Sequence, residues 1–184
     1  HQTGTDRVAE VAKNLECDIV VNIQGDEPLI FPGNINLVIK SLLNSSDCHV
    51  STLMIGIQNI NEMFDPNICK VVVNSKGRAL YFTRAPVPYN RDFWPSYNNV
   101  VDGSIASSNS LGFKHIGVYA FTKSFLLKFS KLKVSPLESI EKLEQLRILD
   151  NGFPIKVMET KKNSISVDRP EDLDLVKKII IKKL

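Results

Sequence analysis

The sequence predicts a three-layer α/β domain in which helices cover both faces of a mostly parallel sheet. Three observations lead to this fold class. Short β-branched runs alternate along the chain with segments of helical periodicity. The run "DIVVNI" is continuously apolar, as expected for a strand covered on both faces. The paired runs in "CKVVVNSKGRALYFTR" predict a β-hairpin inserted into the sheet.

The first half of the chain begins with a helix. Thr3 or Thr5 can cap it, and apolar residues recur on one of its faces as far as Leu15. The following apolar runs and start signals predict a strand at Asp18–Ile23, a helix from Pro32 to about Leu43, a strand at Val50–Ile57, and the hairpin with its turn at Asn74–Gly77.

The second half begins with Ala85–Leu111, which is rich in Pro, Asn and Ser and lacks periodicity, as is typical of a functional or disordered loop. Ser135 to Glu138 form a capping box with proline at the first helical position, and Gly152 stands where a helix C-terminal glycine is expected. The predicted elements are a strand at His115–Phe121, a helix in "TKSFLLKFSKL", a helix from Ser135 to Asp150, a strand in "IKVME", and a last helix opened by "VDRPED".

Bulk properties are those of an ordinary globular protein. A length of 184 residues, 43% hydrophobic and 23% charged, suits one domain over residues 1–184 with a substantial core. The net charge of +3 is too small to favour nucleic acid, and no apolar run is long enough to cross a bilayer. Three widely spaced cysteines favour reduced thiols in a cytoplasm over a disulfide framework or a metal cluster.

An acidic loop, Gln24-Gly25-Asp26-Glu27-Pro28, follows the first predicted strand. Ligands of open α/β sheets bind beyond the carboxyl ends of the strands, so Asp26 is placed to hold a divalent cation or to accept a sugar hydroxyl. Asp168 precedes the last helix and is the best second ligand. The alternatives are a turn-forming role for Asp26 and helix capping by Asp168 with Glu171.

Further polar residues fall at the edges of predicted elements. On a continuous helix Glu144 lies within an apolar stripe, so it needs either a substrate hydroxyl or a partner such as Arg147. Arg84 or Arg91 can hold a substrate carboxylate. His115 and Tyr119, four residues apart on one strand, face the same side of the sheet, although His115 at a strand end is equally typical of a surface residue.

Seven segments together resemble a known family. They are "HQTGTDRVAEV", "IVVNIQGDEPLI", "FDPNICKVVV", "ALYFTRAPVPYNRD", "HIGVYAF", "SPLESIEKLEQLRIL" and "VDRPEDL". In this order they resemble the 3-deoxy-manno-octulosonate (Kdo) cytidylyltransferases, which make CMP-Kdo for lipopolysaccharide biosynthesis. The resemblance spans nearly the whole chain and implies the fold of the nucleotide-diphospho-sugar transferase type.

The resemblance implies a reaction and a set of residues. The anomeric hydroxyl of Kdo attacks the α-phosphate of CTP and releases pyrophosphate, assisted by magnesium without a covalent enzyme intermediate. It implies a homodimer formed through Val71–Asp92, with no nucleic acid or membrane as partner. The implied roles are magnesium binding and catalysis for Asp26 and Asp168, Kdo contacts for Gln24, Arg84, His115, Tyr119, Glu144 and Gln145, and a nucleotide pocket at Thr3, Gly4 and Arg7.

One departure from the family concerns the start of the chain. Members begin with a strand and a loop whose Arg and Lys grip the triphosphate, and this chain begins at His1 without that segment. We therefore expect the 184 residues alone to be poorly active and short of a central strand. The alternatives are a related sugar nucleotidyltransferase, such as a CMP-sialate synthetase, or a non-catalytic remnant that binds nucleotide or dimerises. The "HIGVYAF" and "SPLESIEKLEQLR" segments favour the Kdo enzyme over the sialate enzyme.

Overall fold

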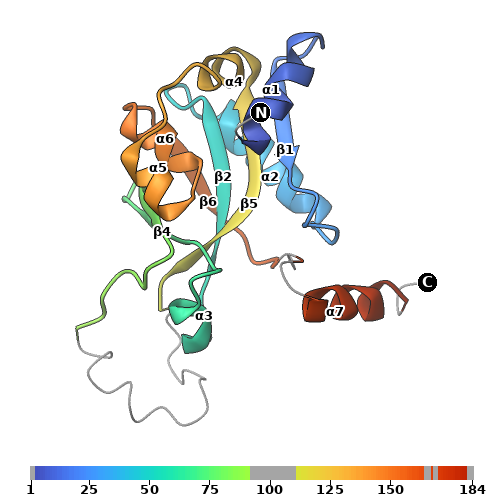
Figure 1. The fold of residues 1–184 in the computed structure, drawn as a ribbon, viewed down its shortest axis with the longest axis vertical. Helices are drawn as coiled ribbons and strands as arrows, with labels where there is room; N and C mark the ends of the chain where they lie inside the picture. Colours follow the sequence, from blue (N-terminus) through green and yellow to red (C-terminus); the bar gives the residue numbers. More distant parts are fainter. Residues whose placement is uncertain (1–2, 92–110, 164–166, 168–169, 182–184) are drawn as a thin grey trace.

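The computed structural model describes residues 3–91, 111–163, 167 and 170–181 (Figure 1). In the order of the chain the elements are α1 (Gly4–Lys13), β1 (Ile19–Ile23), α2 (Pro32–Leu43), β2 (Val50–Gly56), α3 (Ile60–Phe64), β3 (Lys70–Val73), β4 (Ala79–Thr83), β5 (Phe113–Thr122), α4 (Lys123–Phe129), α5 (Pro136–Glu141), α6 (Gln145–Asp150), β6 (Ile155–Glu159) and α7 (Pro170–Ile181). Every predicted strand is present, whereas the short helix α3 had no sequence signal. No helix among these elements is both long and apolar enough to cross a membrane.

The prediction of a mostly parallel sheet is wrong. Among the described strands the order is β4-β3-β5-β2-β6, with β1 also paired to β5, and β2 with β6 is the one hydrogen-bonded pair that runs parallel. β5 runs antiparallel to β1, β2 and β3. Strand–helix alternation predicts parallel neighbours when each helix carries the chain back to the same end of the sheet. β5 does not meet this condition. Its neighbours in the sheet come from much earlier in the sequence, so no single helix connects β5 to them (Figure 1).

Two core clusters lie on opposite faces of this mixed sheet. Along β5, Tyr119 and Phe121 belong to the first cluster, together with residues of α1, α4 and α6. Val118 and Ala120 belong to the second, together with residues of α2. Alternate residues of a strand point to opposite faces, so β5 contributes to both cores at once. The expectation of helical layers on two faces agrees with this arrangement.

The hairpin β3–β4 turns at the predicted place. Asn74 Oδ1 accepts hydrogen bonds from the N–H groups of Lys76 and Arg78, and Gly77 has a φ of +68°. The carbonyl of Gly77 also accepts a hydrogen bond from Val157 N–H at 2.8 Å, so the turn of the hairpin packs against β6. A Cβ on Gly77 would lie 3.1 Å from the carbonyl oxygen of Val157, which together with the positive φ explains the glycine.

The single helix predicted from Ser135 to Asp150 is also wrong. Its start is confirmed, because the Ser135 hydroxyl accepts a hydrogen bond from Glu138 N–H at 3.0 Å. Lys142 then adopts a left-handed conformation, φ 55° and ψ 46°, which ends α5 and separates it from α6. Gly152 follows α6 at φ +79°, as expected for a C-terminal glycine. Because of this break, the carboxylate of Glu141 contacts β4 and that of Glu144 contacts α1.

Candidate active site

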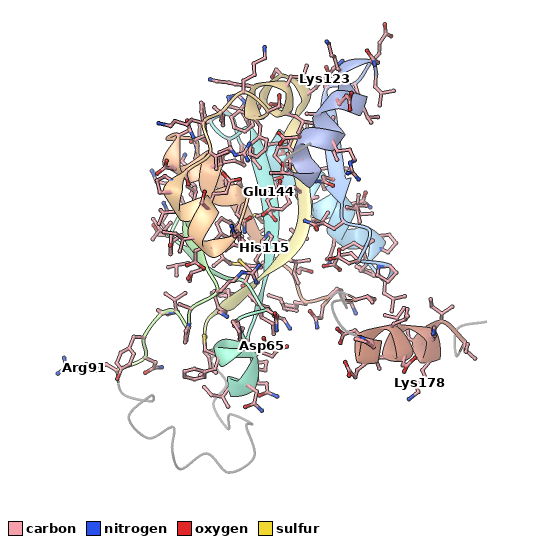
Figure 2. The ribbon with its side chains drawn as sticks, in the orientation of Figure 1. Asp65, Arg91, His115, Lys123, Glu144 and Lys178 are labelled. Carbon is pink, nitrogen blue, oxygen red and sulfur yellow. The ribbon has the colours of Figure 1, made fainter. Side chains whose placement is uncertain are left out.

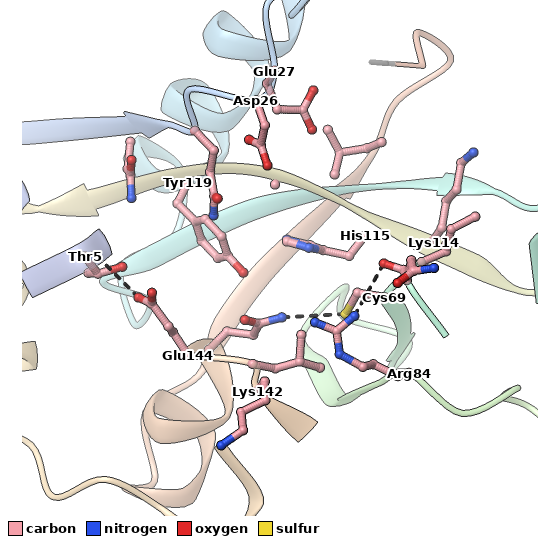
Figure 3. Close-up of a pocket in the computed structure, with 18 of the residues that line it drawn as sticks. Thr5, Asp26, Glu27, Cys69, Arg84, Lys114, His115, Tyr119, Lys142 and Glu144 are labelled. Carbon is pink, nitrogen blue, oxygen red and sulfur yellow. Dashed lines mark hydrogen bonds between the residues drawn. The ribbon is translucent and has the colours of Figure 1, made fainter. Parts of the chain in front are cut away.

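A cavity lies where two strands share one edge of β5. β1 pairs with β5 along 118–122, and β3 pairs with it along Phe113 and Lys114, so the middle of β5 lies between the two pairings. A cavity of about 560 Å³ is found at this position. Its walls come from the end of β1, the segment before β3, β5, and the junction of α5 and α6 (Figure 3).

Most of the predicted site residues meet in this cavity. Its lining includes Gln24, Asp26, Arg84, His115, Tyr119, Glu144 and Gln145. Thr3 caps α1, accepting a hydrogen bond from Asp6 N–H at 3.2 Å, and the next residues of that helix, Gly4 and Thr5, contact Glu144. Arg7 lies instead on a separate apolar groove with Val8 and Val11. Arg91 is not among the lining residues and lies far from His115 and Glu144 (Figure 2).

Asp26 has an unsatisfied carboxylate oxygen. Its Oδ1 is buried and has no hydrogen-bond partner within the described part of the chain. Its backbone carbonyl accepts a hydrogen bond from Val167 N–H at 2.8 Å, so the residue that precedes Asp168 in sequence lies against the acidic loop. Asp168 itself is outside the described residues. An unpaired buried carboxylate oxygen is costly unless a cation or donor completes it, which fits the predicted metal ligand.

His115 and Tyr119 lie together on the wall formed by β5, as predicted. Their ring centroids are 5.2 Å apart, and the His115 ring also makes an edge-to-face contact with Phe82. The alternative of an exposed strand end is therefore wrong for His115. Burial lowers the pKa of His115 to about 3 and raises the pKa of Tyr119 well above its usual value, so both rings are neutral at pH 7. The Tyr119 hydroxyl is buried, and Thr52 lies opposite Tyr119 in the pairing of β2 with β5.

Arg84 is held at the cavity by backbone carbonyls. Its Nε donates to the carbonyl of Glu141 at 2.8 Å, and its Nη1 donates to that of Pro66 at 2.9 Å. The Glu141 carboxylate accepts from Arg84 N–H at 2.9 Å and from the Thr83 hydroxyl at 2.6 Å. Burial would raise the pKa of Glu141, but these hydrogen bonds bring it below its usual value. Glu141 is thus a positioning residue that the sequence did not reveal.

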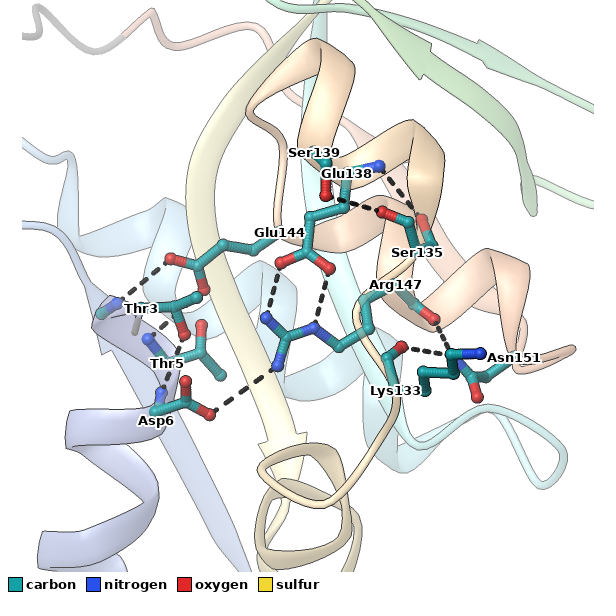
Figure 4. Close-up of polar contacts among 11 residues, drawn as sticks. Thr3, Thr5, Asp6, Lys133, Ser135, Glu138, Ser139, Glu144, Arg147 and Asn151 are labelled. Atoms are coloured by element: carbon teal, nitrogen blue, oxygen red, sulfur yellow. Dashed lines mark hydrogen bonds and ion pairs between the residues drawn. The ribbon is translucent and has the colours of Figure 1, made fainter. Parts of the chain in front are cut away.

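Glu144 contacts the first turn of α1. Its Oε1 accepts a hydrogen bond from Gly4 N–H at 3.1 Å, and its Oε2 accepts one from Thr5 N–H at 3.4 Å (Figure 4). Arg147, the partner considered from the sequence, donates to both carboxylate oxygens of Glu138 instead, at 2.8 and 2.6 Å. The helical-stripe argument therefore placed Glu144 at the site for an incorrect reason, because α6 begins only after this residue.

Gln145 contacts a cysteine of the cavity wall. Its Nε2 lies 3.6 Å from Cys69 Sγ, and burial raises the pKa of that thiol to about 12. The three cysteines are free. Because the Cys69 thiol stays protonated at pH 7, it acts here as a neutral packing partner of the Gln145 amide.

Charged residues of both signs line the cavity, and among them Glu27, Lys114 and Lys142 had no role assigned from the sequence. Figure 3 shows Asp26 and Glu27 on the side opposite Arg84 and Lys142. Lys114, which forms an ion pair with Glu62, also belongs to the lining. Lys114 directly precedes His115 in the sequence. The position of the predicted strand that carries His115 could therefore have indicated Lys114 as a residue of the site. The cavity thus combines carboxylates with basic groups, a composition suited to a cation-bound phosphate and a substrate carboxylate.

The fold and this cavity agree with the class of nucleotidyltransferases. A family model described as Cytidylyltransferase matches residues 1–165. HddC from Yersinia pseudotuberculosis, at 14% identity and a TM-score of 0.60 over 96% of this chain and 62% of that one, shares the fold. A structure of CMP:2-keto-3-deoxy-manno-octonic acid synthetase complexed with CTP is more similar, with a TM-score of 0.85 and 34% identity over 100% of this chain and 70% of that one.

Relatives of known name are closer still in sequence. The 3-deoxy-manno-octulosonate cytidylyltransferase of Geobacter metallireducens is 47% identical over 96% of this chain and 68% of its own length. That of Geobacter sulfurreducens is 46% identical, over 96% of this chain and 69% of its own. The chain belongs to the 3-deoxy-manno-octulosonate cytidylyltransferase family, and it spans about two thirds of the length of these relatives.

Proposed function

We propose that this chain acts in the transfer of CMP from CTP to Kdo, giving CMP-Kdo and pyrophosphate. The oxygen of the anomeric hydroxyl forms a bond to the α-phosphorus as the bond to the pyrophosphate oxygen breaks, and the hydroxyl loses its proton. The observation that carries this proposal is the buried, unpaired Oδ1 of Asp26 in a cavity that also gathers His115, Tyr119 and Arg84. Family membership supplies the substrates.

Asp26 and Asp168 would hold a magnesium ion. Magnesium, when bound, offsets the charge of the phosphates and lowers the pKa of the attacking hydroxyl. Among the described residues no group of three or more His, Cys, Asp or Glu could hold a metal ion. Magnesium characteristically takes one or two protein carboxylates and completes its octahedron with water and phosphate, so Asp26 with one partner fits this ion.

The remaining residues would bind and orient the sugar acid. Arg84, fixed by Glu141 and facing Asp26 across the cavity, would pair with the Kdo carboxylate, which places the sugar's reacting end between the two sides. His115, Tyr119, Gln24 and Gln145 would contact its hydroxyls. Glu144, whose carboxylate holds the first turn of α1, would keep the Thr3–Gly4 segment aligned for the nucleotide.

Pyrophosphate release with CTP, magnesium and Kdo tests this proposal. We expect Asp26→Asn to lower turnover by about a hundredfold or more, the scale for loss of one major electrostatic contact in the transition state. Its free energy of unfolding without metal should stay unchanged or rise, because the unpaired buried carboxylate is removed. Activity should be compared between these 184 residues and a chain extended to the length of the relatives. Turnover of Asp26→Asn close to that of the parent chain would refute the role of Asp26.

We also propose that residues 1–184 form one domain, because both main core clusters pack on the same sheet. A cytoplasmic location is proposed as well, since it suits the free thiols.

The homodimer proposal concerns Val71–Asp92, of which Asp92 lies outside the described residues. Val71 and Phe82 are buried in the core, whereas Leu80 and Tyr89 are 59% and 65% exposed. We expect Leu80→Glu to convert a dimer to monomers in sedimentation experiments. A dimer unaffected by Leu80→Glu would exclude this surface.

A further inference from the structure

Thr52 lies behind the cavity and was assigned no role. It belongs to β2, is fully buried, and stands opposite Tyr119 in the pairing of β2 with β5. The register of the two strands shifts directly after it. At this irregularity the Thr52 hydroxyl contacts three polar atoms of β5: His115 Nε2 at 2.8 Å, the carbonyl of Val118 at 2.8 Å, and the carbonyl of Ile116 at 3.2 Å.

The chemistry of these three contacts determines which atom donates to which. A hydroxyl has one hydrogen to donate and two lone pairs that accept, whereas a carbonyl oxygen only accepts. The Thr52 hydrogen must therefore point toward the carbonyls of Val118 and Ile116. If it pointed at His115 instead, two carbonyl oxygens would face a lone pair in a fully buried place, which is unfavourable. His115 Nε2 is then the donor in its contact with Thr52.

This assignment has a consequence for the other ring nitrogen. Burial lowers the pKa of His115 to about 3, so the ring carries a single proton at pH 7. With that proton on Nε2, Nδ1 carries a lone pair and is a hydrogen-bond acceptor. No residue in the described ranges donates a hydrogen bond to Nδ1, and His115 belongs to the cavity lining. Contacts with Phe82 and Tyr119 keep the ring in this place.

We infer that Thr52 is a positioning residue that fixes His115 as the Nε2–H tautomer, so that Nδ1 accepts a hydrogen bond from a hydroxyl of the bound sugar acid. The site thereby selects a ligand with a donor at this position and rejects one with a ketone or carboxylate oxygen there. The identity of the ligand rests on the proposed function, whereas the tautomer does not, because it follows from the contacts of Thr52 and the neutral charge of the buried ring.

The tautomer is measurable without substrate. The chain contains three histidines, so selective ¹⁵N-histidine labelling and two-bond correlation spectra resolve each ring, with His115→Gln for assignment. At neutral pH we expect the His115 ring to show a protonated Nε2 and an unprotonated Nδ1. Thr52→Ser, which keeps the hydroxyl, should retain this pattern. Thr52→Val, which keeps the shape and removes the hydroxyl, should move proton density toward Nδ1.

Ligand addition tests the second part. Kdo should shift the Nδ1 resonance in the direction of an accepted hydrogen bond, and Thr52→Val should weaken Kdo binding about tenfold, the scale of one lost hydrogen bond, with little effect on CTP. A proton on Nδ1 in the parent chain overturns the inference even if Thr52→Val does not fold, and an unchanged pattern in a folded Thr52→Val does so too. The expected tautomer with no response to Kdo would instead count against Kdo as the ligand, and so against the proposed function.

Discussion

The carboxylate of Glu144 accepts a hydrogen bond from Gly4 N–H at 3.1 Å, although 140 positions separate the two residues in the chain. A second bond from Thr5 N–H reaches its other oxygen. The first N–H groups of a helix have no partner within the helix, so Glu144 acts as a capping residue supplied by a distant element. Its negative charge is also favourable at the N-terminal end of α1.

Glu144→Ala should therefore destabilise the fold near α1. We expect the free energy of unfolding to fall by about 1 kcal/mol, the scale of a lost helix cap. Glu144→Gln keeps one acceptor oxygen and should lose less. Urea unfolding compares the three proteins, and hydrogen exchange of the amides in 4–7 localises the change. Equal stability of the alanine variant and the parent would mean that water replaces the carboxylate at no cost.

The buried pair of Arg147 and Glu138 should be sensitive to removal of one partner. The two side chains are only 3% and 8% exposed and form two hydrogen bonds. Arg147→Met should cost about 3–5 kcal/mol, because it leaves a buried carboxylate without its cation. The double variant with Glu138→Leu should recover most of this loss in denaturant unfolding. No recovery would mean that packing on Phe129, whose ring lies 4.6 Å from the guanidinium, explains the loss instead.

An exposed ion pair provides the matched control. Arg78 and Asp47 are 36% and 49% exposed. Solvent screens such a pair, so Asp47→Ala should change the free energy of unfolding by no more than about 1 kcal/mol. A cost similar to that of Arg147→Met would show that burial does not distinguish the two pairs.

His115 should make stability depend on pH. Burial lowers its pKa from 6.5 to about 3 in the folded chain. Between these values the unfolded chain binds a proton that the folded chain does not. The contribution of neutral His115 is therefore complete above pH 6.5 and declines as the pH falls toward 3, by at most about 1.4 kcal/mol per pH unit.

Urea unfolding from neutral pH to about pH 4 tests this dependence. The stability difference between the parent and His115→Gln should shrink as the pH falls. Parallel curves for the parent and His115→Gln would show that His115 is not kept neutral by the fold.

Gly77→Ala should destabilise the hairpin turn through two causes. The φ of +68° is unfavourable for alanine, and the added Cβ would lie 3.1 Å from the carbonyl oxygen of Val157. Gly152 has a similar φ of +79°, but a Cβ added there would have no atom within 4 Å, so Gly152→Ala isolates the backbone cost of about 1 kcal/mol. Gly77→Ala should cost more than this in thermal unfolding. Equal losses would mean that β6 accommodates the added Cβ without a cost in stability.

Local signals in the sequence were sufficient for the strands, the Ser135 cap, the turn at Asn74–Gly77 and the Gly152 terminus. Each depends on residues within a few positions of one another, where periodicity and backbone preference act directly. Most of the site residues assigned through the motif segments line the cavity. The role of Asp168 stays a prediction, since only its neighbour Val167 is described, beside Asp26.

Tertiary structure decided what depends on distant partners. The direction of β5, the break at Lys142, the capping of α1 by Glu144 and the contacts of Thr52 had no local signal. Strand pairing and buried polar contacts take their free energy from groups far apart in the chain, and periodicity in one segment carries no information about them. The sequence by itself therefore determined the local elements and predicted several of the side chains at the cavity, and the packing of the sheet determined what each side chain contacts.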